Sequence, residues 1–472
     1  MPAEQEIIQR FLEIKRQVHP DVVEYLTAHE DPMIIDRIIA QLPSDAIVVS
    51  SRHIPGYAQE RDGVRFQGAP LEVLSGGAGA SKGKSSFEDF LSYFRDRYTR
   101  LAEMIRSRTS AVPIQALLRN PSYRSQKLEC SIIAMVSEIR TTTNGHRLAE
   151  MEDSTGQISV LFNRERPVFA DAERIVPDEV IGVKGSLSSD GKLFFAESIV
   201  RPDIPVNHAP YRSSEPGIAV FISDIHVGSD TFLEGEWMRF ADWISDNEVQ
   251  YLLVAGDLVD GIGIYPNQQE ELTITDIYEQ YRALGALLSD LPSHIQILLS
   301  PGNHDIVRGV EPQQAIPERF REGFPSNCIW VENPCMVSLQ GVRVLMYHGR
   351  SIDDMIGLIP EASYSRPQQM MEEMLKRRHL ALTYGKRVPL AAEKRDRLVI
   401  DHIPDVLHTG HVHTWGITRY RGVLGINAGA WQSQTSFQKQ MNIQPTPARA
   451  VVLDLQTLET NVLDFSKHPE TA

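Results

Sequence analysis

The most constraining feature of this chain is a series of five apolar runs in its second half, each of which ends in side chains that can bind metal. Such runs predict buried strands, and the helical stretches 231–247 and 275–291 lie between them. Strands that alternate with helices predict a layered α/β sheet, in which ligands bind beyond the carboxyl ends of the strands. The candidate ligands are, in chain order, Asp224 and His226, Asp257 and Asp260, Asn303, His304 and Asp305, His348, and His411 and His413.

The types and spacing of these side chains indicate a metal-dependent hydrolase. Side chains alternate along an extended strand end, so we expect Asp224 and His226 to point the same way, and likewise His411 and His413. Mixed oxygen and nitrogen ligands without thiolate suit Mn²⁺, Fe²⁺ or Zn²⁺ better than Ca²⁺ or a structural zinc ion. A single buried Asp or His is usually a hydrogen-bonded core residue, whereas the ordered series as a whole favours a site with two metal ions.

Length and composition bound the domain organisation. A chain of 472 residues is too long for one ordinary domain, so we expect two or three. Its 47 Lys and Arg residues against 62 Asp and Glu give a formal charge of -15, which argues against a generally basic surface for nucleic acid. A local groove or a basic partner is still compatible with that charge. The three cysteines form no CxxC pair, so neither a disulfide framework nor a thiolate zinc site is expected.

No targeting or membrane segment is expected. The first residues are acidic where a secretion signal would be basic. No apolar run approaches the ~18 residues that a membrane span needs. We therefore expect a soluble cytoplasmic protein without a membrane partner.

The N-terminal region is expected to contain a helical module and a linker. Residues 1–55 carry apolar residues at helical spacing, and such a module is either a partner-binding element or a plain cap. Residues 56–86 are rich in Gly, Ala and Ser, which predicts a flexible linker. Within it, Gly83, Lys84 and Ser85 resemble the end of a phosphate-binding loop, but the buried strand that such a loop requires does not precede them.

The middle of the chain is expected to form a small barrel. Residues 87–111 open with a strongly amphipathic helix, 87–106, whose apolar stripe is expected to be a packing surface. Residues 112–203 predict five short strands with a helix at 165–175 between the third and the fourth, which is the order of an OB-fold barrel. Such barrels often bind single strands, but balanced charges and few aromatic residues make a barrel that faces a protein partner an equal alternative. A proline-containing connector, 204–216, then leads to the α/β domain, 217–472.

The series DxH, GDxxD, GNHD, a strand-end His-Gly and GHxH resembles the motifs of the calcineurin-like metallophosphoesterases. The resemblance implies one metal ion held by Asp224, His226, Asp257 and His413, and a second held by Asp257, Asn303, His348 and His411. It also implies that Asp257 bridges the two ions, which clamp a phosphoryl group and activate a water molecule. His304 would then protonate the leaving oxygen as a general acid. Asp260 matches the position that orients this histidine, with Asp305 as an alternative, and Arg350 is a candidate for a phosphate contact.

The order of the whole chain is similar to that of the small subunits of the archaeal family D DNA polymerases. A helical front end, a linker, the helix at 87–106, an OB barrel and a fused phosphoesterase cover nearly all of the sequence. The related small subunits of eukaryotic replicative polymerases share this architecture but typically lack the ligands, which are present here. The resemblance implies a 3′→5′ exonuclease that proofreads a primer 3′ end with two divalent ions, Mn²⁺ before Fe²⁺ or Zn²⁺. It also implies a heterodimer with a large catalytic subunit, associated with the nucleoid in an archaeal cytoplasm.

Two other functions are kept as alternatives. In the first, the chain is a scaffold subunit of the replication machinery whose metal site is kept inactive by blocked access. In the second, it is a stand-alone phosphatase or cyclic-nucleotide phosphodiesterase, although the long front end has no evident purpose in a small-molecule enzyme.

Overall fold

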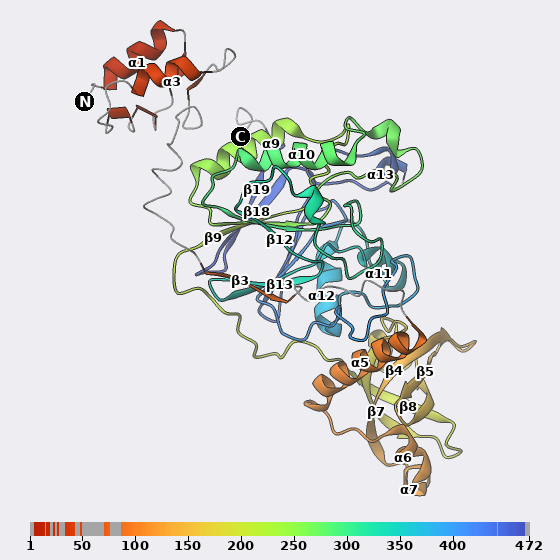
Figure 1. Ribbon diagram of the computed structural model, residues 1–472. Coiled ribbons are helices and arrows are strands. Elements are labelled where there is room, and N and C mark those ends of the chain that lie inside the picture. The colour runs from red at the N-terminus through yellow and green to blue at the C-terminus, as the bar shows by residue number, and fades with distance from the viewer. Residues whose placement is uncertain are drawn as a thin grey trace. The chain divides into compact units, whose positions relative to one another are not determined.

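The computed structural model describes residues 4–14, 16–18, 22–23, 26–27, 34–42, 48–49, 70–75, 86–440 and 442–467. The chain divides into two compact units, one of residues 1–69 with 292–294 and one of residues 70–291 with 295–472 (Figure 1). All of the candidate metal ligands belong to the larger unit.

The smaller unit has a hydrophobic core of its own. It contains the helices α1 (Glu4–Glu13) and α3 (Ile34–Gln41) and a short parallel pair of strands, β1 (Gln17–Val18) and β2 (Val48–Val49). Its core includes Ile7, Phe11, Leu26 and Ile38. The helical spacing of apolar residues in this part of the sequence therefore corresponds to helices whose apolar faces pack together.

The middle of the chain forms a closed five-stranded barrel in the order β4-β5-β6-β8-β7. The strands are β4 (Glu129–Thr141), β5 (Arg147–Asp153), β6 (Gly156–Phe162), β7 (Val180–Leu187) and β8 (Leu193–Val200). Helix α8 (Val168–Ala172) lies between the third and fourth strands, and α6 (Ile114–Arg119) and α7 (Pro121–Ser125) precede the first. Apolar side chains from all five strands fill the interior. The predicted five-stranded barrel with its single inserted helix is confirmed.

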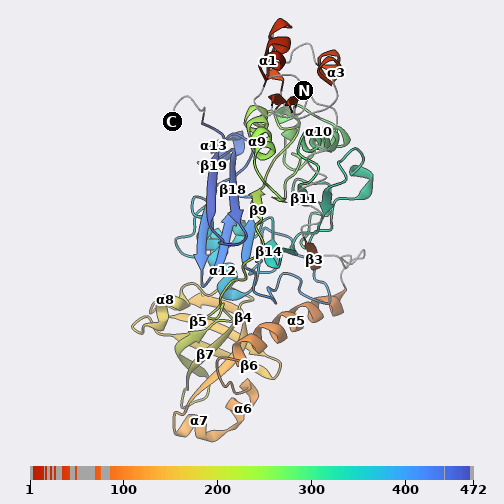
Figure 2. The same cartoon turned by 90° about the vertical axis from the view of Figure 1, so that its left-hand side faces the viewer.

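The predicted amphipathic helix is α5 (Phe87–Arg106). Its start is fixed by a capping box, in which the Ser86 hydroxyl accepts from the Asp89 amide and the Asp89 carboxylate accepts from the Ser86 amide. Leu101 and Ile105 of its apolar stripe pack on the barrel, and Figure 2 shows the helix lying beside β4 and β7. The stripe is a packing surface, as predicted.

The remaining strands form two six-stranded sheets, here called the first and second sheet. The first has the order β12-β11-β10-β9-β18-β19 and the second has the order β16-β17-β15-β14-β13-β3. The first sheet consists of β9 (Ile218–Ile222), β10 (Tyr251–Ala255), β11 (Gln296–Ser300), β12 (Cys328–Trp330), β18 (Arg449–Asp454) and β19 (Thr460–Asp464). The second consists of β3 (Leu71–Ser75), β13 (Cys335–Leu339), β14 (Val342–Met346), β15 (Val406–Thr409), β16 (Gly416–Tyr420) and β17 (Val423–Asn427). The five apolar runs are β9, β10, β11, β14 and β15, which are buried strands as predicted.

Helices cover the outer face of each sheet. On the first sheet, α9 (Glu234–Asp246) and α10 (Ile277–Ser289) pack through a core that includes Trp237 and Leu284. On the second, α11 (Ile352–Leu358) and α12 (Pro367–Arg377) pack through a core that includes Met374. The inner faces meet where the rings of Phe221 and His408 lie 5.0 Å apart. Figure 1 shows this order of helix, sheet, sheet and helix, so the predicted α/β architecture with a separate barrel is confirmed.

Part of the expected linker 56–86 is strand β3, which pairs with β13 in antiparallel fashion at the edge of the second sheet. Four of its five side chains are exposed. Its stability therefore comes from backbone hydrogen bonds to β13 rather than from a buried apolar pattern, which is why the sequence does not predict it. Residues 56–69 and 76–85, with the loop-like Gly83, Lys84 and Ser85, lie outside the described residues. The short helices η2 (Gln268–Glu271), η3 (Glu318–Phe320) and α13 (Ser436–Gln440) lie in loops of the α/β region.

Buried ion pairs attach α5 and the barrel to the α/β layers. Arg97 of α5 donates to the Asp396 carboxylate at 2.7 Å, and His379 contacts the same carboxylate at 2.8 Å. Arg377 of α12 lies 3.2 Å from Glu179 of the barrel. A buried charge without its partner is strongly destabilising, so these pairs hold the two parts together in one arrangement.

Within the described part of the chain, no helix has both the length and the apolar character of a membrane span.

Candidate metal centre

The candidate ligands leave their strands on a left-handed backbone. Asp224, His226, Asp257, His411 and His413 have φ values of 53°, 54°, 49°, 71° and 56°, and each lies beyond the end of its strand. Residues with a side chain rarely adopt this conformation, and such strain is concentrated at functional sites. Each pair does bring its side chains together, but the expected cause, alternation along an extended strand end, is wrong. The tight turns after the strands aim these side chains instead.

The glycines of the motifs allow the main chain to pass directly against the ligand side chains. A Cβ atom on Gly302 would lie 2.8 Å from the carboxyl carbon of Asp257, and closer still to one of its oxygens. A Cβ atom on Gly256 would lie 2.8 Å from Cγ of His348. Normal carbon–carbon contacts are about 3.5–4.0 Å, so any larger residue would displace a ligand.

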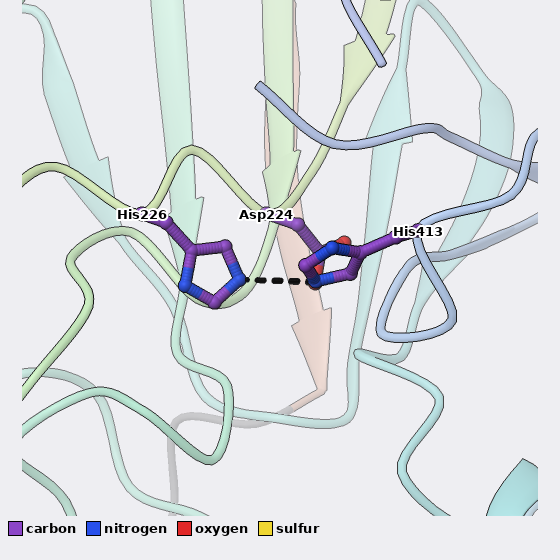
Figure 3. Close-up of side chains that lie close together, drawn as sticks. All are labelled: Asp224, His226 and His413. Atoms are coloured by element: carbon purple, nitrogen blue, oxygen red, sulfur yellow. Dashed lines mark hydrogen bonds and ion pairs between the residues drawn. The ribbon is translucent and has the colours of Figure 1, made fainter. Parts of the chain in front are cut away.

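The first group of candidate ligands consists of Asp224, His226 and His413 (Figure 3). The Nε2 atoms of the two histidines lie 3.1 Å apart. Asp224 Oδ1 lies 3.5 Å from Nε2 of His413 and 3.9 Å from Nε2 of His226. Two imidazole nitrogens and a carboxylate that converge in a buried place form a donor set that fits a divalent metal ion.

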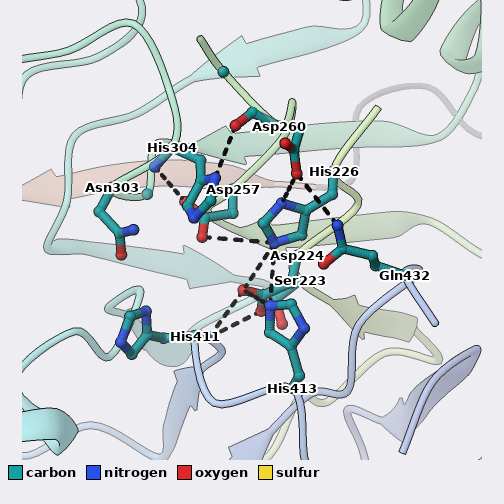
Figure 4. A network of polar contacts seen from close by, with 12 residues as sticks. Ser223, Asp224, His226, Asp257, Asp260, Asn303, His304, His411, His413 and Gln432 are labelled. Atoms are coloured by element: carbon teal, nitrogen blue, oxygen red, sulfur yellow. Dashed lines mark hydrogen bonds and ion pairs between the residues drawn. The ribbon is translucent and has the colours of Figure 1, made fainter. Parts of the chain in front are cut away.

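The second group consists of Asp257, His348 and His411. Nε2 of His348 lies 3.3 Å from Asp257 Oδ2 and 3.1 Å from the amide oxygen of Asn303. The same Asp257 oxygen lies 3.7 Å from Nε2 of His226, so this carboxylate lies between the two groups (Figure 4). Together the groups offer carboxylate, imidazole and amide ligands without thiolate, which suits a metal of the Mn²⁺, Fe²⁺ or Zn²⁺ type.

Outer contacts fix which nitrogen of each histidine faces the centre. Nδ1 of His348 lies 2.8 Å from the Ala255 carbonyl, and Nδ1 of His226 lies 3.0 Å from the Asp260 carboxylate. Each acceptor requires the proton on Nδ1, so the lone pair of Nε2 is directed to the centre. His411 is turned the other way, because its Nε2 lies 3.2 Å from Asp353. Metal-binding histidines usually have such a partner on the second nitrogen.

Charges at the centre perturb each other strongly. Burial alone would raise the pKa of Asp257, but the imidazoles of His348 and His304 hold it well below its usual range. Burial would likewise lower the pKa of His348, yet the Asp257 carboxylate raises it to about 10. The pKa of His226 is raised against burial to about 9 by Asp260 and Asp257. A metal ion competes with these protons, so its binding should release protons and weaken at low pH.

His304 is held by Asp260, but not as the sequence suggested. Its Nδ1 lies 2.8 Å from the main-chain carbonyl of Asp260, whereas the Asp260 carboxylate contacts His226, Gln268 and Gln432. Asp260 therefore orients His304 through its backbone and His226 through its side chain. The arrangement leaves Nε2 of His304 available to a substrate, and desolvation lowers the pKa of this imidazole.

Asp305 and Arg350 lie in other surroundings. The Asp305 carboxylate accepts from the amides of Leu258 and Gly302 and from the hydroxyl of Tyr281. Burial and the nearby Asp257 raise its pKa to about 7. These contacts join the loops after β10 and β11, so Asp305 is a loop-fixing residue rather than the partner of His304. Arg350 is partly exposed and donates to the Gly309 carbonyl at 2.9 Å.

Four contacting residues are missed by sequence reasoning: Asp353, Gln268, Gln432 and Gln438. The amide nitrogen of Gln438 lies 2.8 Å from Nδ1 of His413. None of the four belongs to a ligand motif, and each reaches the centre from a different loop or helix start. Only the folded chain brings them to the histidines.

The fold and the site define a class of protein: a two-sheet α/β protein with a buried Asp/His metal centre and an attached barrel. The family of DNA polymerase alpha/epsilon B-type subunits matches residues 219–414. A DNA polymerase II small subunit of Halobacterium salinarum is 43% identical over 402 residues, which cover 84% of this chain and 78% of the relative. Those of Methanothermobacter thermautotrophicus and Thermoplasma acidophilum are 44% and 37% identical, covering 84% and 92% of this chain and 83% and 90% of their own lengths.

This chain belongs to the family of DNA polymerase II small subunits. The resemblance predicted from the sequence is thereby confirmed. A solved archaeal phosphodiesterase overlaps with 52% of this chain and 98% of its own at 14% identity and a TM-score of 0.28, which is too low to bear on the fold.

Proposed function

We propose that this chain is the 3′→5′ exonuclease of a two-subunit DNA polymerase and removes mispaired nucleotides from a primer end. The observation that carries the proposal is the convergence of the whole ligand series on one buried centre, with His304 beside it. The printed names of the relatives describe small subunits, so we propose a large catalytic subunit as the partner, in the nucleoid of an archaeal cytoplasm. The net charge of -15 fits a partner that supplies most of the DNA-binding surface.

In this proposal two divalent ions bind, with Mn²⁺ favoured over Fe²⁺ or Zn²⁺, in a calcineurin-like pair of sheets. One ion is held by Asp224, His226, Asp257 and His413, and the other by Asp257, Asn303, His348 and His411. When bound, the ions supply a clamp for the phosphodiester and a nucleophile at neutral pH. The chain supplies the buried, rigid placement of the ligands, because strained backbone and close-packed glycines permit little movement.

His304 is the proposed proton donor to the leaving 3′ oxygen. The Asp260 carbonyl fixes its Nδ1, so Nε2 is the atom that meets the substrate. Desolvation lowers the pKa of the free imidazole. The negative charge of a bound phosphodiester acts in the opposite direction and favours the protonated form that donates. Arg350 is the proposed contact to a neighbouring phosphate.

The test is digestion of a 5′-labelled primer with a mismatched 3′ end, by the chain alone and with its large subunit, in Mn²⁺. Asp257→Asn and His304→Ala should abolish stepwise shortening from the 3′ end. Asp290→Asn and His402→Ala change exposed residues of the same types and should cleave like wild type. Absence of shortening by the wild-type complex would support the scaffold alternative. Cleavage of a small chromogenic diester but not of DNA would support the stand-alone phosphodiesterase.

A further inference from the structure

The histidine His411 has a carboxylate partner that belongs to none of the ligand motifs. Asp353, in the first turn of α11, places one carboxylate oxygen 3.2 Å from Nε2 of His411. The hydroxyl of Tyr364 donates to the other oxygen at 2.9 Å. With its proton directed to Asp353, only Nδ1 of His411 keeps a lone pair for a metal ion. The side chain of Asp353 is fixed at both ends, so it sets both the tautomer and the direction of the imidazole.

The start of α11 is fixed in turn by the segment 382–388. The neighbouring carboxylate, Asp354, accepts from the main-chain amides of Arg387 at 2.9 Å and Val388 at 3.0 Å. These bonds connect the first turn of α11 to a segment that has no regular secondary structure. The position of Asp353 therefore depends on where this segment lies.

The same segment is attached to the barrel and to α5. The Tyr384 amide donates to Asp178 at 2.8 Å, in the loop between α8 and β7. The Tyr384 ring lies 5.4 Å from the ring of Phe90 and 5.6 Å from that of Phe94, both on α5. Arg97 of α5 donates to the Leu382 carbonyl at 3.3 Å. The segment is thus held on one side by the barrel and α5 and on the other by α11.

We propose that Asp353 is a positioning residue for His411, and that the segment 382–388 couples the barrel and α5 to metal affinity at that side of the centre. The inference rests on the metal centre of the proposed function and adds a regulatory element to it. The Asp224 group makes no use of this route, because its outer contacts are Asp260 and Gln438. The coupling should therefore act on one of two metal positions. A partner that binds the barrel or α5 and stabilises Tyr384 in its place would tighten the same position.

The first test is titration of the metal-free full-length chain with Mn²⁺ by calorimetry, which needs no nuclease activity. Asp353→Asn should weaken one of two binding events by about 10- to 100-fold and leave the other unchanged, as the loss of a carboxylate behind a metal-binding histidine usually does. Tyr364→Phe removes one hydroxyl and should weaken the same event by a smaller factor. Unchanged affinity at both positions in Asp353→Asn would overturn the inference.

The coupling is tested by Tyr384→Ala with Tyr384→Phe as the matched control. The alanine removes the ring that packs on α5 and should weaken the same binding event several-fold, whereas phenylalanine keeps the ring and should bind like wild type. In the double variant with Asp353→Asn, the effect of Tyr384→Ala should largely disappear, because both changes act on His411. Full additivity of the two effects would overturn the coupling.

Circular dichroism of each metal-free variant separates a folding defect from a change in affinity. If a larger change unfolds the chain, Tyr364→Phe still decides the matter: unchanged Mn²⁺ binding in this variant would refute the role of Asp353. A wild-type chain that binds Mn²⁺ twice but does not digest DNA would contradict the exonuclease proposal and leave the positioning role testable.

Discussion

The glycine before Asn303 offers a sharp test of how the centre is built. Gly302 does not adopt a positive φ, so alanine is compatible with its backbone and the substitution acts only through the added Cβ atom. That atom would lie 2.8 Å from the carboxyl carbon of Asp257, where about 3.5 Å is needed, so the carboxylate must move by about 0.7–1 Å. Asp257 is the one ligand proposed to be shared by both metal positions. A misplacement of about 1 Å costs roughly 100-fold in rate, which corresponds to about 3 kcal/mol.

We therefore expect Gly302→Ala to reduce the rate of primer digestion by about 100-fold and to weaken Mn²⁺ binding at both positions. Overpacking should also lower the free energy of unfolding of the metal-free chain by about 1–3 kcal/mol. The assays are single-turnover digestion of the mismatched primer, calorimetric Mn²⁺ titration and urea unfolding.

The matched control is Gly235→Ala in the first turn of α9. The nearest heavy atom to a Cβ atom there is a guanidinium nitrogen of Arg239 at 3.9 Å, so the side chain has room. Alanine at this helical position should leave activity unchanged and raise stability by up to about 1 kcal/mol. Wild-type digestion and wild-type Mn²⁺ affinity in Gly302→Ala would refute the view that close approach of the main chain fixes Asp257.

Three further predictions concern stability. Asp396→Asn leaves the buried Arg97 without its anion and should lower the free energy of unfolding by about 3–5 kcal/mol in urea; a loss below about 1 kcal/mol would contradict this. Burial lowers the pKa of His408 to about 3, against 6.5 when unfolded, so the neutral imidazole stabilises the fold above about pH 6.5 and this stabilisation is lost as the pH falls towards 3. Between pH 7 and pH 4.5 the loss is about 3 kcal/mol, and His408→Leu should show an acid-induced decrease in urea midpoint that is smaller by this amount; an equal decrease in both proteins would refute it. Mn²⁺ at 100 times its dissociation constant should stabilise the fold by about 2.7 kcal/mol per independent site, and a melting temperature unchanged by Mn²⁺ or by a chelator would contradict the metal centre.

Much of the architecture follows from local sequence patterns. The apolar runs that become β9, β10, β11, β14 and β15 are too uniformly apolar to be stable on a surface, so burial in a sheet is their stable environment. The helix at 87–106 combines a continuous apolar stripe with Ser86 and Asp89 at its start, and both features act within a few residues. The alternation of short strands similarly predicts the barrel. In each case the deciding interactions are near in sequence.

The strand β3 and the interface around Arg97 could not be predicted in this way. β3 is mostly exposed, and only its pairing with β13, more than 250 residues away, makes it a strand. Arg97 belongs to a helix whose polar residues would normally face solvent, yet it is buried because Asp396 lies opposite it. Such features depend on which distant residue is available, and a local pattern does not contain that information.

For the candidate centre, the sequence by itself determined which side chains are placed at strand ends, because each motif follows directly after an apolar run. The tertiary structure decided how these side chains are aimed. Left-handed backbone at Asp224 and His226, rather than strand alternation, turns them to one point. The Asp260 carbonyl rather than its carboxylate holds His304, and Asp353 supports His411 from a separate helix. Ligand identity is a property of a short motif, whereas ligand direction and protonation depend on contacts between loops that only folding brings together.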